Sequence, residues 1–393
     1  MDKKNKNPNV PNLRFEKFNN NWSRTTISKV CVCNPKNEDK LDDEFIYIDL
    51  ESVEKGVLKS KNIIHLKNAP SRAQRILYKN DILFQSVRPY QRNNYLLNED
   101  DDFLQYVAST GYIQLRTTLN PYFLFQLLNT DEINNEVMLR CTGTSYPAIN
   151  SNDFSNILIT ITNDRNEQNK IAKFFSLIEE RIQTQIKIID DCISYRNAIV
   201  DYYFESLSGN WKKVKLSNIL KEYSELHIKD DSIVHATLSK EGIFPKTDRY
   251  DRDFLVKDED KKYKVTHLND ICYNPANLKF GVITRNTFGD CIISPIYITF
   301  KIKSGFIPKF VELLVTRKQF ISKARKYEQG TVYERMSVNS SDLLSMYVLI
   351  PSFSIQQKIV NIINNIDNKI FNEQKLLNLY KLQKVYLLKN MFI

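Results

Sequence analysis

The chain has 393 residues, 42% of them hydrophobic, which is enough to bury the cores of two or more domains. Its net charge of +10 favours a polyanionic partner such as DNA or RNA, although a merely soluble basic protein also carries such a charge. The sequence lacks the patterns of a membrane span, a secretory signal and a cysteine-based zinc site, so we expect a cytoplasmic protein with reduced cysteines and no metal.

Residues 1–165 mix two kinds of local pattern. Short β-type runs at 45–48 and 112–115 stand beside helical stretches. Asn120 followed by Pro121 is typical of a helix start, because proline fits the first turn, where its missing N–H is not needed. We therefore expect a domain of the α+β class.

Residues 166–206 are the first of two predicted long helices. The stretch 167–204 contains neither glycine nor proline, and its apolar residues recur at alternating three- and four-residue steps, as in the seam of a coiled coil. Asp164 followed by Glu167 predicts a capping box at the start of this helix.

The second half of the chain follows the same plan. Residues 207–353 mix a β-type run at 292–300 with helical stretches, and residues 354–393 predict a second long helix with the same seam. Ser354 with Gln357 is the expected cap of that helix. Together the segments predict an α+β fold with two tandem α+β domains, each followed by a long helix.

The two halves are copies of one module. The two tryptophans, Trp22 and Trp211, each follow an asparagine and begin a similar short motif. The two motifs are 189 positions apart (211 minus 22). Three further landmarks recur in the same order at nearly the same offset: 80–84 with 269–273, 143–146 with 330–333, and 168–171 with 356–359. Such constant spacing indicates a pseudo-two-fold internal repeat.

The two helical seams carry polar residues at matching places, Gln185 and Arg196 in the first helix and Glu373 and Lys384 in the second. In a parallel pair Arg196 faces Lys384, and the two cations repel each other. In an antiparallel pair the cations separate, and Gln185 meets Glu373. We therefore expect an antiparallel coiled coil whose register Gln185 and Glu373 set. The alternative is that these polar residues are simply solvated.

No catalytic set is apparent in the sequence. A DNA methyltransferase that acts on amino groups needs Asn or Asp followed by two prolines and an aromatic residue, but 120–123 and 274–277 each lack the second proline. Glycine-rich cofactor loops and a phosphate loop for ATP are also missing. Acidic pairs such as Asp42-Asp43 are interpreted as solvated residues rather than nuclease ligands. We expect a protein that is not an enzyme and binds no cofactor itself.

One repeated loop carries side chains suited to reading DNA. Arginine can contact guanine, and asparagine or glutamine can contact adenine, through forked donors and acceptors. The segment 85–95 combines these side chains without an acid, and the second half has a counterpart. The candidates are Gln85, Ser86, Arg88, Tyr90, Gln91, Arg92, Asn93 and Asn94 in the first half, and Asn274, Asn277, Lys279, Arg285 and Asn286 in the second. The alternative is a polar surface loop.

A second repeated feature is a Gly-Thr turn beside cations. Such a turn can bring backbone N–H groups close to a phosphate. The candidates are Arg140, Thr144, Ser145 and Tyr146 in the first half, and Arg325, Lys326, Thr331, Tyr333 and Arg335 in the second. The alternative is a structural turn between domain and helix.

These landmarks together resemble a known family. They are the Trp22 motif, the segment 81–90 (Asp-Ile-Leu-Phe-Gln-Ser-Val-Arg-Pro-Tyr), the segment 143–150 (Gly-Thr-Ser-Tyr-Pro-Ala-Ile-Asn) and a long helix that opens with 168–171 (Gln-Asn-Lys-Ile). In kind and order they resemble the specificity subunits of type I restriction–modification systems, as does the opening 11–15 (Pro-Asn-Leu-Arg-Phe). The resemblance covers nearly the whole chain and lies more in the repeat architecture than in any one motif.

The resemblance implies two target recognition domains, each reading one half of a split site in double-stranded DNA, with the helix pair setting the gap. It also implies docking of two modification subunits, which hold S-adenosylmethionine and methylate adenine. Restriction/translocase subunits that use ATP and magnesium join them in the restriction enzyme. The chain itself is then the DNA-specificity subunit and carries no catalytic residue.

The second half departs from the first at two of these places. Residues 274–277 (Asn-Pro-Ala-Asn) stand where the first half has 86–89, and Glu334-Arg335 stand where it has Pro147-Ala148. Two different half-sites require such divergence. Two other functions stay open, namely a coiled-coil interaction scaffold without sequence-specific DNA reading and a self-contained methyltransferase.

Overall fold

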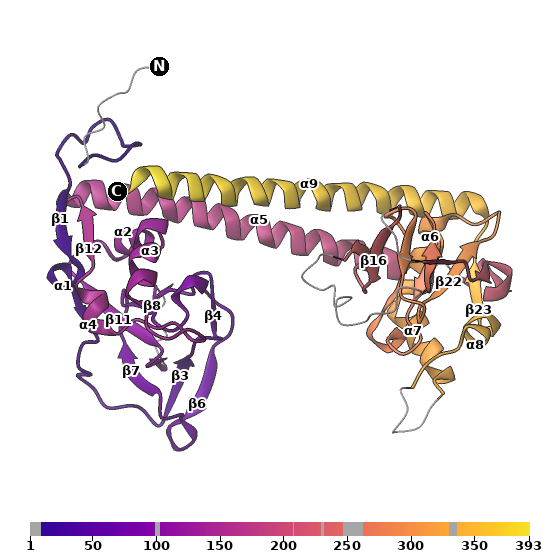
Figure 1. Cartoon of the computed structure of the whole chain (residues 1–393), viewed down its shortest axis with the longest axis horizontal. Helices are drawn as coiled ribbons and strands as arrows, with labels where there is room; N and C mark the ends of the chain where they lie inside the picture. The colour runs from indigo at the N-terminus through magenta and orange to yellow at the C-terminus, as the bar shows by residue number, and fades with distance from the viewer. Residues whose placement is uncertain (1–8, 99–102, 207, 229–231, 247–261, 330–335) are drawn as a thin grey trace. The chain divides into compact units, whose positions relative to one another are not determined.

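The computed structural model describes residues 9–98, 103–206, 208–228, 232–246, 262–329 and 336–393 (Figure 1). The chain divides into two compact units. Unit 1 consists of Met1–Ile188 and Glu373–Ile393, and unit 2 of Ile189–Asn372. Each unit therefore contains one globular part and a portion of both long helices. The division into four consecutive segments, 1–165, 166–206, 207–353 and 354–393, stays a prediction.

The two long helices are α5 (Arg165–Glu205) and α9 (Phe353–Met391), as the seam pattern predicts. Among the described residues, neither these nor any other helix is long and apolar enough to cross a membrane. At the start of α5, Asp164 accepts the backbone N–H of Glu167 at 3.3 Å. The reciprocal half of the predicted capping box is wrong. The buried Glu167 carboxylate instead accepts hydrogen bonds from Nε and Nη2 of Arg14, at 2.6 and 2.8 Å.

The predicted cap of α9 is wrong. The helix begins one residue earlier than Ser354, and the side chain of Gln357 donates to Asn361 on the helix surface. The buried residue here is Gln356, whose side chain donates to the carbonyl of Pro351 at 3.2 Å and accepts the N–H of Ile307 at 3.1 Å. This end of the helix is therefore held by contacts distant in sequence.

The helices pair in the predicted antiparallel sense. In unit 1 Lys384 contacts Glu179 at 2.5 Å, and Gln185 donates to Glu373 at 2.6 Å. Residue numbers therefore decrease along α9 in the direction in which they increase along α5, so the helices are antiparallel. Gln185 is 5% exposed, so it is not solvated. In unit 2 Arg196 pairs with Asp367 of α9 at 2.5 Å. Control of the register by Gln185 and Glu373 stays a prediction.

Unit 1 contains two four-stranded sheets. Its strands are β1 (Ser23–Thr26), β2 (Cys31–Cys33), β3 (Glu44–Ile48), β4 (Val53–Glu54), β5 (Val57–Leu58), β6 (Asn62–His65), β7 (Ala73–Leu77), β8 (Ile82–Gln85), β9 (Tyr95–Leu96), β10 (Gln105–Ser109), β11 (Tyr112–Thr117) and β12 (Leu158–Ile161). One sheet has the order β2-β11-β8-β9, and the other has β6-β3-β10-β7 with β3 and β10 parallel. In addition, β1 pairs with β12 and β4 with β5.

Unit 2 repeats this topology. Its strands are β13 (Lys212–Lys215), β14 (Leu220–Tyr223), β15 (Leu226–Ile228), β16 (Val234–Leu238), β17 (Ile243–Pro245), β18 (Lys262–Thr266), β19 (Ile271–Tyr273), β20 (Ile283–Arg285), β21 (Cys291–Ile293), β22 (Ile298–Ile302) and β23 (Tyr347–Ile350). The orders are β14-β22-β19-β20 and β15-β18-β21-β16-β17, and β13 pairs with β23. The parallel pair β16–β21 matches β3–β10, and β15 is an added edge strand.

One predicted β run is divided in the structure. The stretch 292–300 covers parts of two strands, β21 and β22, that belong to different sheets. A turn separates them, in which the N–H of Tyr297 donates to the carbonyl of Ser294 at 3.1 Å around Pro295. Proline has no N–H for a strand ladder, which accounts for the break.

Short helices cover one sheet of each unit. They are α1 (Ile27–Val30), α2 (Pro121–Leu128), α3 (Asp131–Arg140) and α4 (Ser151–Ser155) in unit 1, and α6 (Pro308–Thr316), α7 (Lys318–Ala324) and α8 (Ser340–Ser345) in unit 2. In unit 1, α2 and α3 lie between the helix pair and strands β8 and β11 (Figure 1). The Asn120 side chain caps α2 by accepting the N–H of Phe123, so the predicted helix start at Pro121 is confirmed.

An aromatic centre completes the core of unit 1. Trp22, Phe123 and Phe392 are buried, with ring centroids 5.4 to 6.2 Å apart. Phe392 directly follows the last residue of α9. The globular part of unit 1 is therefore closed by the far end of the second long helix.

Unit 2 has the matching centre. Trp211, Phe310 and Phe204 lie with ring centroids 5.2 to 6.0 Å apart. Phe204 belongs to the last turn of α5, and Phe392 directly follows the last turn of α9. In both units, then, a tryptophan that begins the repeat packs on the end of a long helix.

Substitution of Phe392 by alanine is expected to lower the free energy of unfolding of unit 1 by about 3–5 kcal/mol, because it leaves a cavity among packed rings. Urea unfolding followed by hydrogen exchange measures each unit separately. The control is Phe371→Ala, at a side chain of α9 that is 65% exposed and lies in unit 2, which should change the stability of either unit little. Equal losses for both variants contradict the packing argument.

Candidate nucleic-acid interface

Two segments of the first half that the sequence predicts separately lie together in unit 1. Val87 and Ala148 form a β-bridge, and the N–H of Arg88 donates to the carbonyl of Pro147 at 2.7 Å. Thr142 pairs with Ala148 to form a small hairpin, here called hairpin 142–148. It lies against residues 86–92, here called loop 86–92. The predicted base-reading loop and Gly-Thr turn are therefore one continuous surface.

Loop 86–92 is a single 3-10 turn, Pro89–Gln91, held between two left-handed residues. Arg88 has φ 53° and Arg92 has φ 55°. Residues other than glycine rarely adopt this conformation, and it persists only where surrounding contacts impose it. A short loop with two such residues is held in one shape by its surroundings.

Those surroundings are amide side chains. Gln85, 1% exposed, donates to the carbonyl of Val87 and to the side chain of Gln91, both at 2.8 Å, and accepts the N–H of Asn93 at 2.9 Å. Asn94, 2% exposed, accepts the N–H of Gln85 at 2.8 Å. These predicted base readers are engaged inside the protein, where they shape the loop. Their contact with DNA stays a prediction.

The remaining candidates of this surface differ in exposure. The Ser86 hydroxyl is buried and donates to the carbonyl of Gly111 at 2.7 Å. Tyr90 is 51% exposed, and Thr144 and Ser145 are exposed at the end of the hairpin. Gly143 has φ +89°, and a Cβ there would lie 3.0 Å from a backbone oxygen, so the turn requires glycine.

The three arginines of this surface have different partners. Arg92 pairs with Asp131 at 2.6 Å, and Arg140 pairs with Glu136 of its own helix. The guanidinium carbon of Arg88 instead lies 4.3 Å from the ring centroid of Tyr146, which is 63% exposed. Arg88 is thus held by an aromatic face rather than by a carboxylate.

Unit 2 builds the equivalent loop with other residues. Its 3-10 turn is Leu278–Phe280, and Gly281 (φ 83°) stands where unit 1 has Arg92. Asn277 (φ −109°) precedes this turn as the left-handed Arg88 precedes the turn of unit 1, so the structure matches Asn277 with Arg88 and corrects the sequence match with Pro89. Asn277 and Lys279 are exposed, and the Lys279 ammonium lies 5.1 Å from the ring centroid of Phe280. The scaffold is shared, and the exposed side chains differ.

The other second-half candidates are less available. Asn274 is buried and accepts the N–H groups of the two residues after Pro275. Asn286 is fully buried and holds the turn that ends at Gly289. Arg285 contacts Glu312 at 3.0 Å, and Arg325 contacts Glu328 at 3.3 Å. Lys326 is exposed. Thr331, Tyr333 and Arg335 lie outside the described residues.

A repeated turn that the sequence revealed only as a landmark forms a second feature. In unit 1 the turn holds Asn80 (φ 72°) and Asp81, and in unit 2 it holds Asn269 (φ 73°) and Asp270. The carboxylate of each aspartate accepts a backbone N–H three residues earlier, at 2.9 and 2.7 Å. In the sequence these turns are visible only as the repeated Asn-Asp pair, 189 positions apart, and that repetition does not indicate a binding surface.

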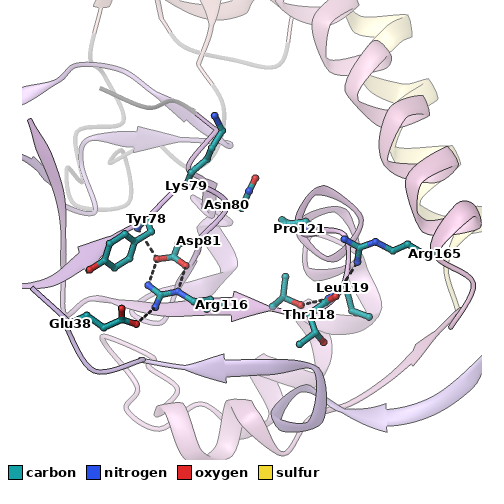
Figure 2. Close-up of a pocket in the computed structure, with 11 residues that line it drawn as sticks. Glu38, Tyr78, Lys79, Asn80, Asp81, Arg116, Thr118, Leu119, Pro121 and Arg165 are labelled. Atoms are coloured by element: carbon teal, nitrogen blue, oxygen red, sulfur yellow. Dashed lines mark hydrogen bonds and ion pairs between the residues drawn. The ribbon is translucent and has the colours of Figure 1, made fainter. Parts of the chain in front are cut away.

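Next to the first turn lies an open cleft of about 460 Å³ (Figure 2). Arg116 donates two hydrogen bonds to the buried carboxylate of Asp81, at 2.9 and 3.0 Å. Figure 2 shows this pair on the same side of the cleft as Glu38. Arg165 lies on the opposite side and donates to the carbonyl of Thr118 at 3.0 Å. Across the described part of the chain, no three His, Cys, Asp or Glu side chains gather as a metal site.

The second turn carries a titratable group. His267 lies 3.1 Å from the carboxylate of Glu225 and 3.0 Å from that of Asp290. The hydrogen bond to Glu225, reinforced by Asp290, raises the pKa of His267 above its ordinary value. The His267 imidazole therefore links three segments of unit 2.

Because the pKa of His267 is higher in the folded state, its contribution to stability is fully present below the unfolded value of 6.5 and is lost as pH rises through the folded pKa. The stability lost on His267→Gln should therefore be largest in mild acid and shrink at alkaline pH, measured by urea unfolding of unit 2. His65→Gln, at an exposed pair with Glu44, is the control. A loss that is independent of pH refutes the assignment.

Substitution of Gln85 by alanine should loosen loop 86–92, because buried backbone groups lose their partners. We expect the free energy of unfolding of unit 1 to fall by about 1–3 kcal/mol and amide exchange in the loop to accelerate. Gln74→Ala, at an exposed glutamine of the same unit, is the matched control. Unchanged amide exchange in the Gln85 variant argues against the network.

Three comparisons place the chain among known proteins. No protein-family model matches it. Over 131 residues, 32% of the chain, it is 28% identical to the type I restriction enzyme HindI specificity subunit of Haemophilus influenzae, of whose length it spans 28%.

The structural likeness extends much further. A solved chain of a type I restriction–modification system has a TM-score of 0.61 at 17% identity, covering 94% of this chain and 97% of that one. The S subunit of the type I system of M. genitalium has a TM-score of 0.55 at 16% identity, covering 98% and 99%. The chain is therefore similar in sequence, over the matched third, to a type I specificity subunit, and it has the fold of such S subunits over nearly its whole length.

Proposed function

We propose that the chain is the DNA sequence-specificity subunit of a type I restriction–modification enzyme and that it reads a bipartite site in double-stranded DNA. The observation that carries this proposal is the pair of loops built on one scaffold. Pro89–Gln91 and Leu278–Phe280 are the same 3-10 turn in units of the same topology, but they expose different side chains. Two unlike reading surfaces on a duplicated frame suit a site with two unlike halves.

The partners follow from this role. The chain docks two modification subunits, which supply S-adenosylmethionine and methylate adenine, and restriction/translocase subunits, which use ATP and magnesium. Its own contribution is recognition, so we do not assign it an enzymatic activity. The net charge of +10 supports contact with the phosphate backbone, which supplies affinity without specifying sequence. We place the assembly in the cytoplasm, with the DNA that it reads.

The purified chain with its modification subunit and S-adenosylmethionine should methylate adenine at a split motif, and the chain alone should not. Single-molecule sequencing of DNA from cells that carry both subunits reads the motif directly. Lys279→Ala, in the loop of unit 2, should alter the preference in one half of the motif and leave the other half unchanged. Methylation at one short undivided motif, or at no defined motif, contradicts the proposal.

A further inference from the structure

Arg88 differs from its neighbours in how its charge is balanced. Arg92 and Arg140 each pair with a carboxylate, whereas within the described residues Arg88 forms no ion pair. A guanidinium that is paired with a carboxylate already has part of its donor fork and its charge engaged, so a new acceptor competes with the existing partner. Among the residues that the structure describes, no carboxylate competes in this way for Arg88.

The position of the Arg88 guanidinium is nevertheless restrained. Its carbon lies 4.3 Å from the Tyr146 ring centroid, a cation–π contact that leaves the N–H donors at the edge of the group available. The backbone restrains it as well, because the N–H of Arg88 donates to the carbonyl of Pro147, the residue next to Tyr146. Arginine and tyrosine are therefore held together by both side chains and main chain.

The backbone of Arg88 is in a costly conformation that the fold does not need. At the equivalent place in unit 2, Asn277 has φ −109° and the 3-10 turn still forms. The left-handed conformation at Arg92 has its counterpart in Gly281, so that one belongs to the scaffold. Strain confined to one copy, at a partly exposed cation that forms no ion pair with the described residues, is typical of a functional residue.

We propose that Arg88 determines specificity in unit 1 by reading a guanine, and that Tyr146 is its positioning residue. This inference rests on the proposed function. The guanidinium offers a rigid fork of donors, which matches the O6 and N7 acceptors of guanine in the major groove. A phosphate contact needs only a point charge, for which a mobile lysine suffices, whereas this site restricts one arginine in position and backbone.

The test uses the full chain, its modification subunit and S-adenosylmethionine on a library of DNA sites. Arg88→Lys keeps the charge and removes the fork, and Arg88→Asn removes the charge with a residue that tolerates left-handed backbone. Both variants should reduce discrimination at one guanine position of one half-site, by roughly 5- to 150-fold, and leave other positions unchanged. Tyr146→Ala should weaken the same position, and Tyr146→Phe, which keeps the ring, should preserve it.

Arg24→Lys, the same change at an exposed arginine of β1, is the control and should leave the motif intact. A uniform fall in methylation at all sites for Arg88→Lys identifies a phosphate contact and overturns the inference, as does an unchanged motif for both Arg88 variants. In those cases a bipartite wild-type motif still supports the proposed function. A wild-type complex that directs no bipartite methylation overturns both.

Discussion

The apolar seam of the two long helices is the constraint on which the rest of the structure depends. A helix of this length with one apolar stripe is unstable in water unless the stripe is covered. Here Gln185 of α5 contacts Glu373 of α9, and an aromatic side chain at the end of each helix packs in a globular core, Phe204 in unit 2 and Phe392 in unit 1. Phe392 and Phe204 occupy equivalent places in the cores of the two units. Each globular part therefore needs the end of a long helix to complete its core.

Much of this arrangement could be predicted from sequence. The spacing of apolar residues and the recurrence of motifs can be seen in the sequence itself. They predict the long helices, their antiparallel pairing and the duplicated α+β units. The helix starts were less predictable. Glu167 is bound by Arg14, far away in the chain, and Gln356 by Ile307, and no local capping pattern encodes such partners. The division of 292–300 between two sheets likewise depends on strand pairing across the unit.

The candidate interface was predictable as a segment but not residue by residue. Composition drew attention to loop 86–92 and to hairpin 142–148, yet it could not place one against the other. Composition also does not distinguish an amide side chain that faces solvent from one that is hydrogen-bonded to the main chain of its own loop. Gln85 and Asn286 are buried because main-chain groups nearby need partners, which is a property of the folded loop. The arginine–tyrosine contact arises only once both segments meet.

The closing of unit 1 by Phe392 has a consequence for how the protein is made. Every residue of unit 2 precedes this side chain in the chain, so the ribosome delivers a complete unit 2 before unit 1 has its last core residue. Until then Trp22 and Phe123 lack their aromatic partner, while the second copy of the same topology is already complete. Nascent chains of this protein are thus exposed to mispairing between copies, and chaperone demand should be concentrated on the older half of the chain.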